Sequence, residues 1–282
     1  MFFGFFQTAK IHIYDAYNKT YKIFLSQVID TLMKLHILGV KIDNLTQTEV
    51  MIKIKEFLDS RQKYYVATVN PEMIVDAVHN KEFFHILNYA DICIPDGFGI
   101  VLASFASKNK IKERFTGVDF LWKTCQLAEQ NDYSVYFLGA KEGVAQAAAN
   151  KVKKVFPQLR VAGYCSGGII DNPKNVDKAL IKKINTAKPD ILFVAMNHVK
   201  QEKFIFYQMD NLTQTRLAVG VGGTFDYLSG DIKRAPHFMR KIGFEWFYRL
   251  MHEPKRLPRI YKATVVFPFL FLKYSLKKWR NK

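Results

Sequence analysis

The sequence predicts an α/β protein with a doubly wound, mostly parallel sheet and a basic helical C-terminal appendage. From Tyr64 onward, five short apolar runs alternate with longer segments of helical periodicity. Strands that alternate with helices of this length are typical of βαβ units, which build a parallel sheet. After Gly230 the alternation stops, and arginines and aromatic residues interleave at roughly helical spacing.

The helix starts support this interpretation. Asn70 offers an N-cap, Pro71 a proline in the first turn, and Glu72 an acidic residue beside the positive end of the helix dipole. Thr116, with Asp119 three residues later, resembles a capping box in which Asp replaces the usual Glu. The expected strands are YYVAT, DICIP, SVYFLG, ILFVAM and RLAVGV. Together these signals indicate a Rossmann-like α/β domain.

Three segments differ in character. Residues 1–35 are an N-terminal extension of uncertain structure, residues 36–230 form the α/β domain, and residues 231–282 form the appendage. The formal net charge of the chain is +17, and residues 231–282 hold 14 Lys and Arg residues but three Asp and Glu residues. This excess predicts an anionic partner for the appendage: a nucleic acid, an acidic lipid or a substrate that carries phosphate.

Composition also indicates the membrane topology and the redox compartment of the protein. The longest apolar run, residues 263–272, is about half of the roughly 20 residues that a spanning helix needs, and it contains Pro268. The chain is therefore not expected to span a membrane, although it is free to lie on one. Three scattered cysteines, with no metal-ligand spacing, do not form a disulfide framework and fit a reducing cytosol.

The candidate site lies where the expected strands end. In open α/β sheets, ligands bind beyond the carboxyl ends of the strands. The residues at those positions are Thr68, Asn70, Asp96-Gly97-Phe98-Gly99, Gly139-Ala140, Met196-Asn197-His198 and Gly220-Val221-Gly222-Gly223. One crevice is expected to collect them.

Asp96 is the sharpest candidate for a catalytic base. Glycines on its C-terminal side allow its carboxylate to project into a cleft and allow a substrate to approach the backbone closely. The alternative is that Asp96 forms an Asx-turn or caps the following helix. Asn70 and Thr68 are open to the same two interpretations, since each precedes a helix start and could contact substrate.

No metal site is expected. The chain contains no H-E-x-x-H pattern and no D-x-D pattern. A diphosphate leaving group would then need positive charge from Arg249, Arg256 and Arg259, whose forked guanidinium groups suit bidentate phosphate binding. The alternative for these arginines is a solvated basic face.

Eight ordered blocks of sequence are similar to a known family. They are Thr68-x-Asn70-Pro71, Pro95-Asp96-Gly97-x-Gly99, Arg114-x-Thr116-Gly117, Phe137-Leu138-Gly139, Gln201-Glu202-Lys203, Gly220-Val221-Gly222-Gly223-Thr224-Phe225-Asp226, Arg234-Ala235-Pro236 and Glu245-Trp246-x-x-Arg249-Leu250-x-x-Glu253-Pro254. From about Leu38 to about Arg259, the chain resembles the WecG/TagA/CpsF family of glycosyltransferases, glycosyltransferase family 26.

The resemblance implies an inverting, metal-independent enzyme without a cofactor. Such an enzyme moves N-acetylmannosamine, its uronic acid or another hexose from a UDP-sugar to a sugar linked to an undecaprenyl diphosphate, in bacterial cell-surface polysaccharide or teichoic acid synthesis. It implies a cytoplasmic protein, peripheral on the inner face of the membrane. Independently of the resemblance, the apolar run at residues 263–272 beside Lys273, Lys277, Lys278 and Arg280 predicts that residues 231–282 contact anionic lipid. The alternative is a helical tail packed on the core or on a neighbouring subunit. A homo-oligomer is left open.

The resemblance also implies roles for individual residues. Asp96 is the base that deprotonates the acceptor hydroxyl. The expected pocket residues around donor sugar and acceptor are Thr68, Asn70, Arg114 and Gln201. Gly222 and Asp226 are expected contacts to the nucleotide, and the expected contacts to the leaving diphosphate are Arg249, Arg256 and Arg259.

One departure and three alternatives qualify this interpretation. Where the family has a Gly-x-Pro-x-Gln-Glu turn, this chain reads MNHVKQE at residues 196–202, which leaves the sugar preference open. One alternative is a UDP-hexose transferase of capsule or exopolysaccharide assembly. Another is a basic nucleic-acid-binding protein, although no RNA or DNA module is visible. A dinucleotide-dependent oxidoreductase is disfavoured because the glycines of VGVGGTFD lack the G-x-G-x-x-G spacing.

Overall fold

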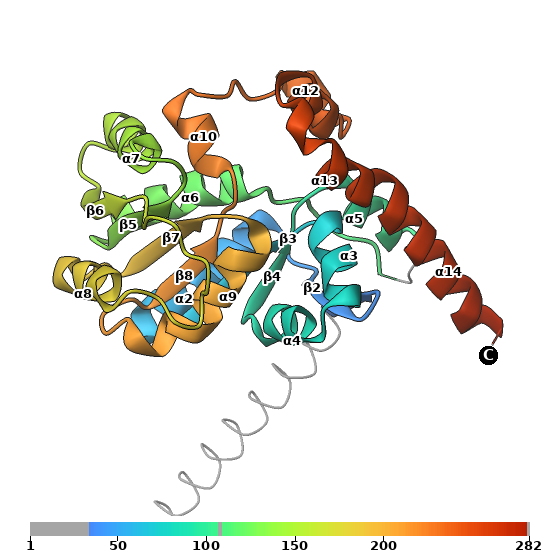
Figure 1. The fold of residues 1–282 in the computed structure, drawn as a ribbon, viewed down its shortest axis with the longest axis horizontal. Coiled ribbons are helices and arrows are strands. Elements are labelled where there is room, and N and C mark those ends of the chain that lie inside the picture. Colours follow the sequence, from blue (N-terminus) through green and yellow to red (C-terminus); the bar gives the residue numbers. More distant parts are fainter. Residues whose placement is uncertain (1–33, 107–108, 281–282) are drawn as a thin grey trace, which may run out of the picture. The chain divides into compact units, whose positions relative to one another are not determined.

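The predicted parallel sheet is confirmed. The computed structural model describes residues 34–106 and 109–280. Within them lies a six-stranded sheet in the order β4-β3-β8-β7-β5-β6, in which all neighbouring strands are parallel (Figure 1). The strands are β3 (Tyr64–Val69), β4 (Ile92–Pro95), β5 (Ser134–Gly139), β6 (Arg160–Cys165), β7 (Ile191–Ala195) and β8 (Leu217–Gly220).

The sequence pattern missed three strands. The edge strand β6 is partly exposed along its length, so its residues do not form the apolar run that marks a central strand. A two-stranded sheet of β1 (Lys34–Ile37) and β2 (Val40–Asp43) precedes the main sheet. Among the described residues, regular structure begins at Lys34, shortly before the predicted start of the α/β domain at residue 36. The predicted extension of uncertain structure falls almost entirely on residues 1–33, which lie outside the described residues.

Helices cover both faces of the main sheet, as a doubly wound fold requires. The helices are α2 (Gln47–Ser60), α3 (Pro71–His79), α4 (Lys81–Tyr89), α5 (Phe98–Ser104), α6 (Gly117–Gln130), α7 (Val144–Val155), α8 (Lys178–Ala187), α9 (His198–Gln208) and α10 (Thr224–Ser229), with a 3₁₀ turn η1 (Met209–Asn211). Tyr65, Ala67 and Val69 of β3 share one core cluster with residues of α3, α4 and α9. On the opposite face, the ring of Phe137 lies 5.3 Å from that of Phe225 in α10.

The helix starts follow the sequence signals closely. Asn70 caps α3 by accepting a 3.0 Å hydrogen bond from the Met73 N–H. Thr116 caps α6 by accepting from the Asp119 N–H at 3.2 Å. The Asp119 carboxylate accepts from the Thr116 hydroxyl rather than from its backbone N–H. The resemblance to a capping box therefore extends to only half of the reciprocal pair.

The C-terminal appendage is helical, as predicted, and we call residues 231–280 the tail. It contains α11 (His237–Lys241), α12 (Glu245–His252), a 3₁₀ turn η2 (Pro254–Arg256), α13 (Leu257–Tyr261), a π-helical turn η3 (Lys262–Val266) and α14 (Phe267–Arg280). The tail runs beside α3 and α5 (Figure 1). Phe267 is 2% exposed and belongs to the same core cluster as Met73 and Ile100. The tail is thus anchored to the domain by a core side chain.

Among the described residues, no helix combines the length and the hydropathy that crossing a membrane would require.

Candidate active site

A cavity of about 260 Å³ lies at the carboxyl ends of β3, β4, β7 and β8, and the tail supplies part of its wall. Nine of the ten predicted site residues line it: Thr68, Asn70, Asp96, Arg114, Gln201, Gly222, Arg249, Arg256 and Arg259. The tenth, Asp226, lines a neighbouring cavity of about 880 Å³, which shares Gly222, Arg256 and Arg259 with the first. These distant positions meet because parallel strands all end at one edge of the sheet.

The loop after β4 holds Asp96 in place. Its N–H donates a 2.7 Å hydrogen bond to the carbonyl of Val69. The next residue, Gly97, has a φ of 109°, and a Cβ there would lie 3.0 Å from Cδ of Pro71, so only glycine fits. Helix α5 begins after Gly97 and has no side-chain capping bond. Asp96 therefore does not cap the helix that follows it.

The Asp96 carboxylate instead contacts a helix distant in sequence. Its Oδ2 atom accepts a 3.1 Å hydrogen bond from the N–H of Gly117, the first residue of α6. Burial raises the pKa of Asp96 to about 6, although the Gly117 hydrogen bond and the charge of Arg114 act against this rise. At neutral pH this group is ionised yet basic enough to take up a proton, which suits a general base.

Thr68, Asn70 and Arg114 are each held by one hydrogen bond to the backbone. The Thr68 hydroxyl donates to the carbonyl of Gly220 at 2.8 Å and so ties β3 to β8. The Oδ1 atom of Asn70 caps α3, while its amide nitrogen has no hydrogen-bond partner among the described residues. The Arg114 guanidinium donates to the carbonyl of Arg240 at 3.0 Å, so α11 orients it. Each of the three side chains therefore has further donor or acceptor capacity with which to hydrogen-bond a ligand.

Gln201 joins the ends of β7 and β8. Its Oε1 atom accepts from the N–H of Gly222 at 2.9 Å and from the N–H of Met196 at 3.3 Å. Its amide nitrogen donates to Glu202 at 2.9 Å. Both polar atoms of the Gln201 side chain are therefore hydrogen-bonded within the protein, and the side chain fixes the two loops that line the cavity. The Gly222 N–H is likewise committed to Gln201.

The three tail arginines are not a solvated face, which corrects the alternative raised from charge pattern. The exposed fractions of the side chains of Arg249, Arg256 and Arg259 are 16%, 19% and 38%. Arg249 donates to Glu253 at 2.8 Å and to Asp226 at 3.4 Å, and its guanidinium lies 4.6 Å from the centre of the Tyr227 ring. These contacts fix the guanidinium groups around the cavity.

The electrostatics of the arginine group favour an anionic ligand. Burial and the neighbouring Arg249 lower the pKa of Arg256, although a 2.7 Å hydrogen bond to Glu253 opposes this. Burial raises the pKa of Asp226, against the influence of Arg249 and Arg256. Cations that are crowded and partly desolvated gain from a bound anion. Diphosphate has the charge and the geometry to fill this role.

Sequence reasoning missed several residues of the site. Tyr227, Glu245 and Trp246 line the cavity, but they come from α10 and α12, whose placement no local pattern reveals. Glu202 is 0% exposed and accepts a short hydrogen bond from the hydroxyl of Tyr65. Nothing in the local sequence pattern shows that this carboxylate is buried. The one sequence signal for Glu202 is its place in the Gln201-Glu202-Lys203 block.

Comparisons with known proteins agree with the geometry. The model of the glycosyl transferase WecG/TagA/CpsF family matches residues 35–281. A relative from Bacillus subtilis is 32% identical over 206 residues, which cover 73% of this chain and 78% of the relative. A relative from Bacillus spizizenii is 35% identical over 204 residues, covering 72% and 77%. A relative from Staphylococcus aureus is 32% identical over 246 residues, covering 86% and 94%.

All three relatives carry the name N-acetylglucosaminyldiphosphoundecaprenol N-acetyl-beta-D-mannosaminyltransferase. The family match covers nearly all of the described residues, and the relatives align along most of their own length. The enzyme interpretation of the sequence is thereby confirmed. The chain belongs to the WecG/TagA/CpsF family and is a glycosyltransferase.

Proposed function

We propose that this enzyme transfers N-acetylmannosamine from UDP-N-acetylmannosamine to N-acetylglucosaminyl-diphosphoundecaprenol, with inversion at the anomeric carbon. The observation that carries the proposal is the placement of the Asp96 carboxylate and three arginines around one cavity. The names of the relatives supply the sugar and the acceptor. Because UDP-hexoses carry the α anomer, the β-mannosaminyl product in those names corresponds to inversion.

The proposed reaction is a single displacement. The acceptor hydroxyl gives its proton to Asp96 while its oxygen attacks C1 of the donor sugar. The bond between C1 and the diphosphate oxygen breaks, and its electron pair leaves with UDP. Arg249, Arg256 and Arg259 stabilise the negative charge that develops on the leaving group. In this proposal the sugar is oriented by Arg114 and by Asn70, whose amide nitrogen has no hydrogen-bond partner among the described residues.

We propose that the reaction needs no metal ion. Fixed guanidinium groups supply the charge that a bound divalent cation supplies in other transferases. The chain contains no D-x-D pair to hold such an ion. The two nucleotide contacts expected from the resemblance fit this arrangement, since Gly222 and Asp226 both line the neighbouring cavity of about 880 Å³, which Arg256 also lines.

We also propose that the tail lies on an anionic membrane surface, on the cytoplasmic side where the acceptor diphosphate is held. Four large apolar side chains recur along η3 and α14 at helical spacing and are 49–66% exposed: Val265, Phe269, Leu272 and Leu276. Exposed lysines flank this stripe at Lys273 and Lys277. Apolar burial together with attraction to acidic headgroups is the usual basis of interfacial binding.

A transfer assay tests the proposed function. Purified enzyme is mixed with a short-chain lipid-diphosphate-N-acetylglucosamine and one of four donors: UDP-N-acetylmannosamine, its uronic acid, UDP-N-acetylglucosamine or UDP-glucose. We expect the first donor alone to give a disaccharide product by mass spectrometry, with a β linkage by NMR. EDTA should leave the rate unchanged. A product from UDP-glucose alone would support the UDP-hexose alternative and overturn the assignment.

A further inference from the structure

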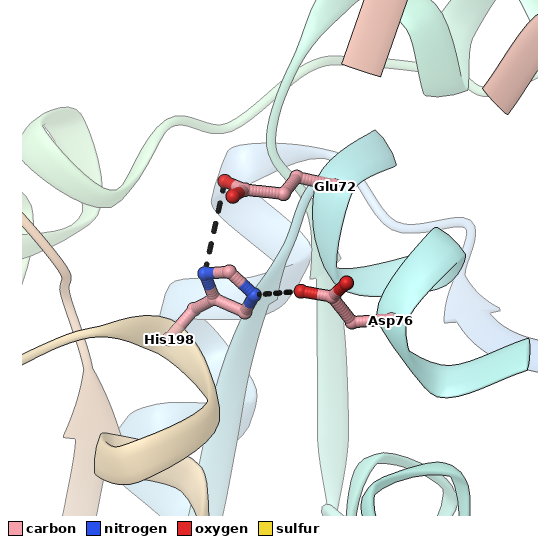
Figure 2. Close-up of side chains that lie close together, drawn as sticks. All are labelled: Glu72, Asp76 and His198. Atoms are coloured by element: carbon pink, nitrogen blue, oxygen red, sulfur yellow. Dashed lines mark hydrogen bonds and ion pairs between the residues drawn. The ribbon is translucent and has the colours of Figure 1, made fainter. Parts of the chain in front are cut away.

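Three side chains from two helices form a cluster beside the cavity (Figure 2). Glu72 and Asp76 lie one turn apart on α3, and His198 is the first residue of α9. The Nε2 atom of His198 lies 2.7 Å from Oδ2 of Asp76, and its Nδ1 atom lies 3.7 Å from Oε2 of Glu72. The imidazole, with 6% of its side chain exposed, fills the space between the carboxylates.

Both carboxylates also bind cations of the tail. The Nε and Nη2 atoms of Arg259 donate to the Glu72 carboxylate at 2.9 to 3.0 Å. The Nζ atom of Lys262 donates to Oδ1 of Asp76 at 2.7 Å. Two residues of the tail, one turn apart, therefore meet two residues of α3, one turn apart. We call these five residues, Glu72, Asp76, His198, Arg259 and Lys262, the tail-docking cluster.

A metal ion is the competing interpretation, because Glu72, Asp76 and His198 bring three potential ligands close together. Two observations disfavour it. Each carboxylate already has a cationic partner from the protein. The Nε2 atom of His198 also lies 2.7 Å from Oδ2 of Asp76, so an ion that binds both atoms would have to push them apart. The negative charges of the two carboxylates are balanced by Arg259 and Lys262, so charge neutrality needs no added ion.

The cluster is coupled to the cavity through Arg259 and His198, which both line it. Arg259 uses Nε and Nη2 for Glu72, and its Nη1 atom has no hydrogen-bond partner among the described residues. A planar guanidinium that is held along one edge presents its remaining N–H groups in a fixed direction. The Asn70 cap, which also lines the cavity, lies two residues before Glu72 on the same helix.

We propose that Glu72 and Asp76, bridged by His198, are positioning residues that dock the tail and fix Arg259 at the cavity. They act on substrate through Arg259 and do not touch it. Lys262 strengthens docking from outside the cavity, so its contribution is separable from that of the arginines. The part of this proposal that concerns substrate rests on the proposed function. The docking itself does not.

A charge-exchange cycle tests the proposal in the full-length protein. The variants are Asp76→Lys, Lys262→Asp and the combination of both, with Lys241→Asp as a matched control, since that lysine is exposed, lies on the same tail and lines neither cavity. Tail docking is measured by limited proteolysis without substrate. UDP affinity, and KM and kcat with a water-soluble acceptor, are measured alongside, so that membrane binding does not enter.

We expect each single variant to speed cleavage of the tail and to raise the KM for the nucleotide sugar by about tenfold, because breaking a partly buried ion pair leaves one charge unpaired. The exchanged pair should restore most of both losses, and Lys241→Asp should change neither. Glu72→Gln, which keeps the shape of the side chain, should raise KM more than it lowers kcat.

Two results would overturn the proposal. One is a Lys262→Asp protein that folds, keeps its tail protected and binds UDP normally. The other is a double variant no better than the worse single variant. If the tail protection follows the cycle while no variant, nor the parent enzyme, binds UDP, then docking stands and the proposed function fails.

Discussion

The Oδ2 atom of Asp96 accepts a 3.1 Å hydrogen bond from the backbone N–H of Gly117, the first residue of α6. The positive end of the helix dipole thus faces the proposed base and favours its ionised form. Burial acts in the opposite direction and is the stronger effect, since the pKa rises to about 6. Asp96 is expected to be ionised in the cell and ready to accept a proton.

Asp96→Asn should remove this function without loss of nucleotide binding. We expect kcat to fall by about 10²–10⁴-fold, the usual contribution of a positioned base, and UDP affinity by calorimetry to stay within about twofold. In the parent enzyme, kcat/KM should rise with pH up to about 6 and then level off, because the base must be deprotonated. The exposed carboxylate of Asp132 is the matched control. Full activity of Asp96→Asn would exclude Asp96 as the base.

Arg256→Lys should show whether geometry or charge alone is needed in the arginine group. Lysine keeps the positive charge but cannot form the planar bidentate contact. We expect UDP to bind about tenfold more weakly to Arg256→Lys and weaker still to Arg256→Ala, as measured by calorimetry. Arg160→Lys, at an exposed position outside the cavity, is the control. Equal UDP affinity in all four proteins would mean that Arg256 does not contact the diphosphate.

Glu202→Gln should change the pH dependence of stability. Burial raises the pKa of Glu202 from 4.5 to about 7, against the hydrogen bonds from Tyr65 and Gln201. The folded state then holds the proton more tightly than the unfolded state, so the parent protein loses stability as pH rises from about 4.5 to about 7.

Glutamine cannot ionise and avoids this loss. We therefore expect the Tm of Glu202→Gln, relative to the parent, to rise across the same pH range and to level off above it. Glu56→Gln, an exposed position on α2, should show no such trend. A constant Tm difference between Glu202→Gln and the parent from pH 4.5 to 8 would mean that Glu202 keeps an ordinary pKa in the fold.

Membrane binding should depend on the apolar stripe of α14. The double variant Phe269→Ser with Leu272→Ser removes two side chains that are 66% and 60% exposed, so the fold should survive. We expect flotation with acidic liposomes to weaken by at least about tenfold, since each buried side chain contributes about 1.5–3 kcal/mol. Ile52→Ser, on α2, is the control. Unchanged flotation of the double variant would point instead to a packing role, such as contact with a second subunit.

The sequence by itself determined the parallel sheet and the strand ends. Central strands are buried on both faces, so their sequences are continuous apolar runs. The helices that connect them in βαβ units make the strands parallel. Asp96 and Thr68 could be placed at the site for this reason, since a residue that follows a parallel strand must lie at the ligand-binding edge. The edge strand β6 was not predicted, because its residues are partly exposed and do not form an apolar run.

Tertiary structure alone decided how the tail completes the site. Arg259 and Glu72 meet across 187 positions of sequence, and no local rule of spacing relates them. The same holds for the hydrogen bond that Gly117 donates to Asp96 and for the one that Tyr65 donates to Glu202. Such contacts depend on which helix packs on which strand, and the pKa values of Asp96 and Glu202 follow from that packing. Local residue type sets the available chemistry, while burial and long-range pairing set its strength.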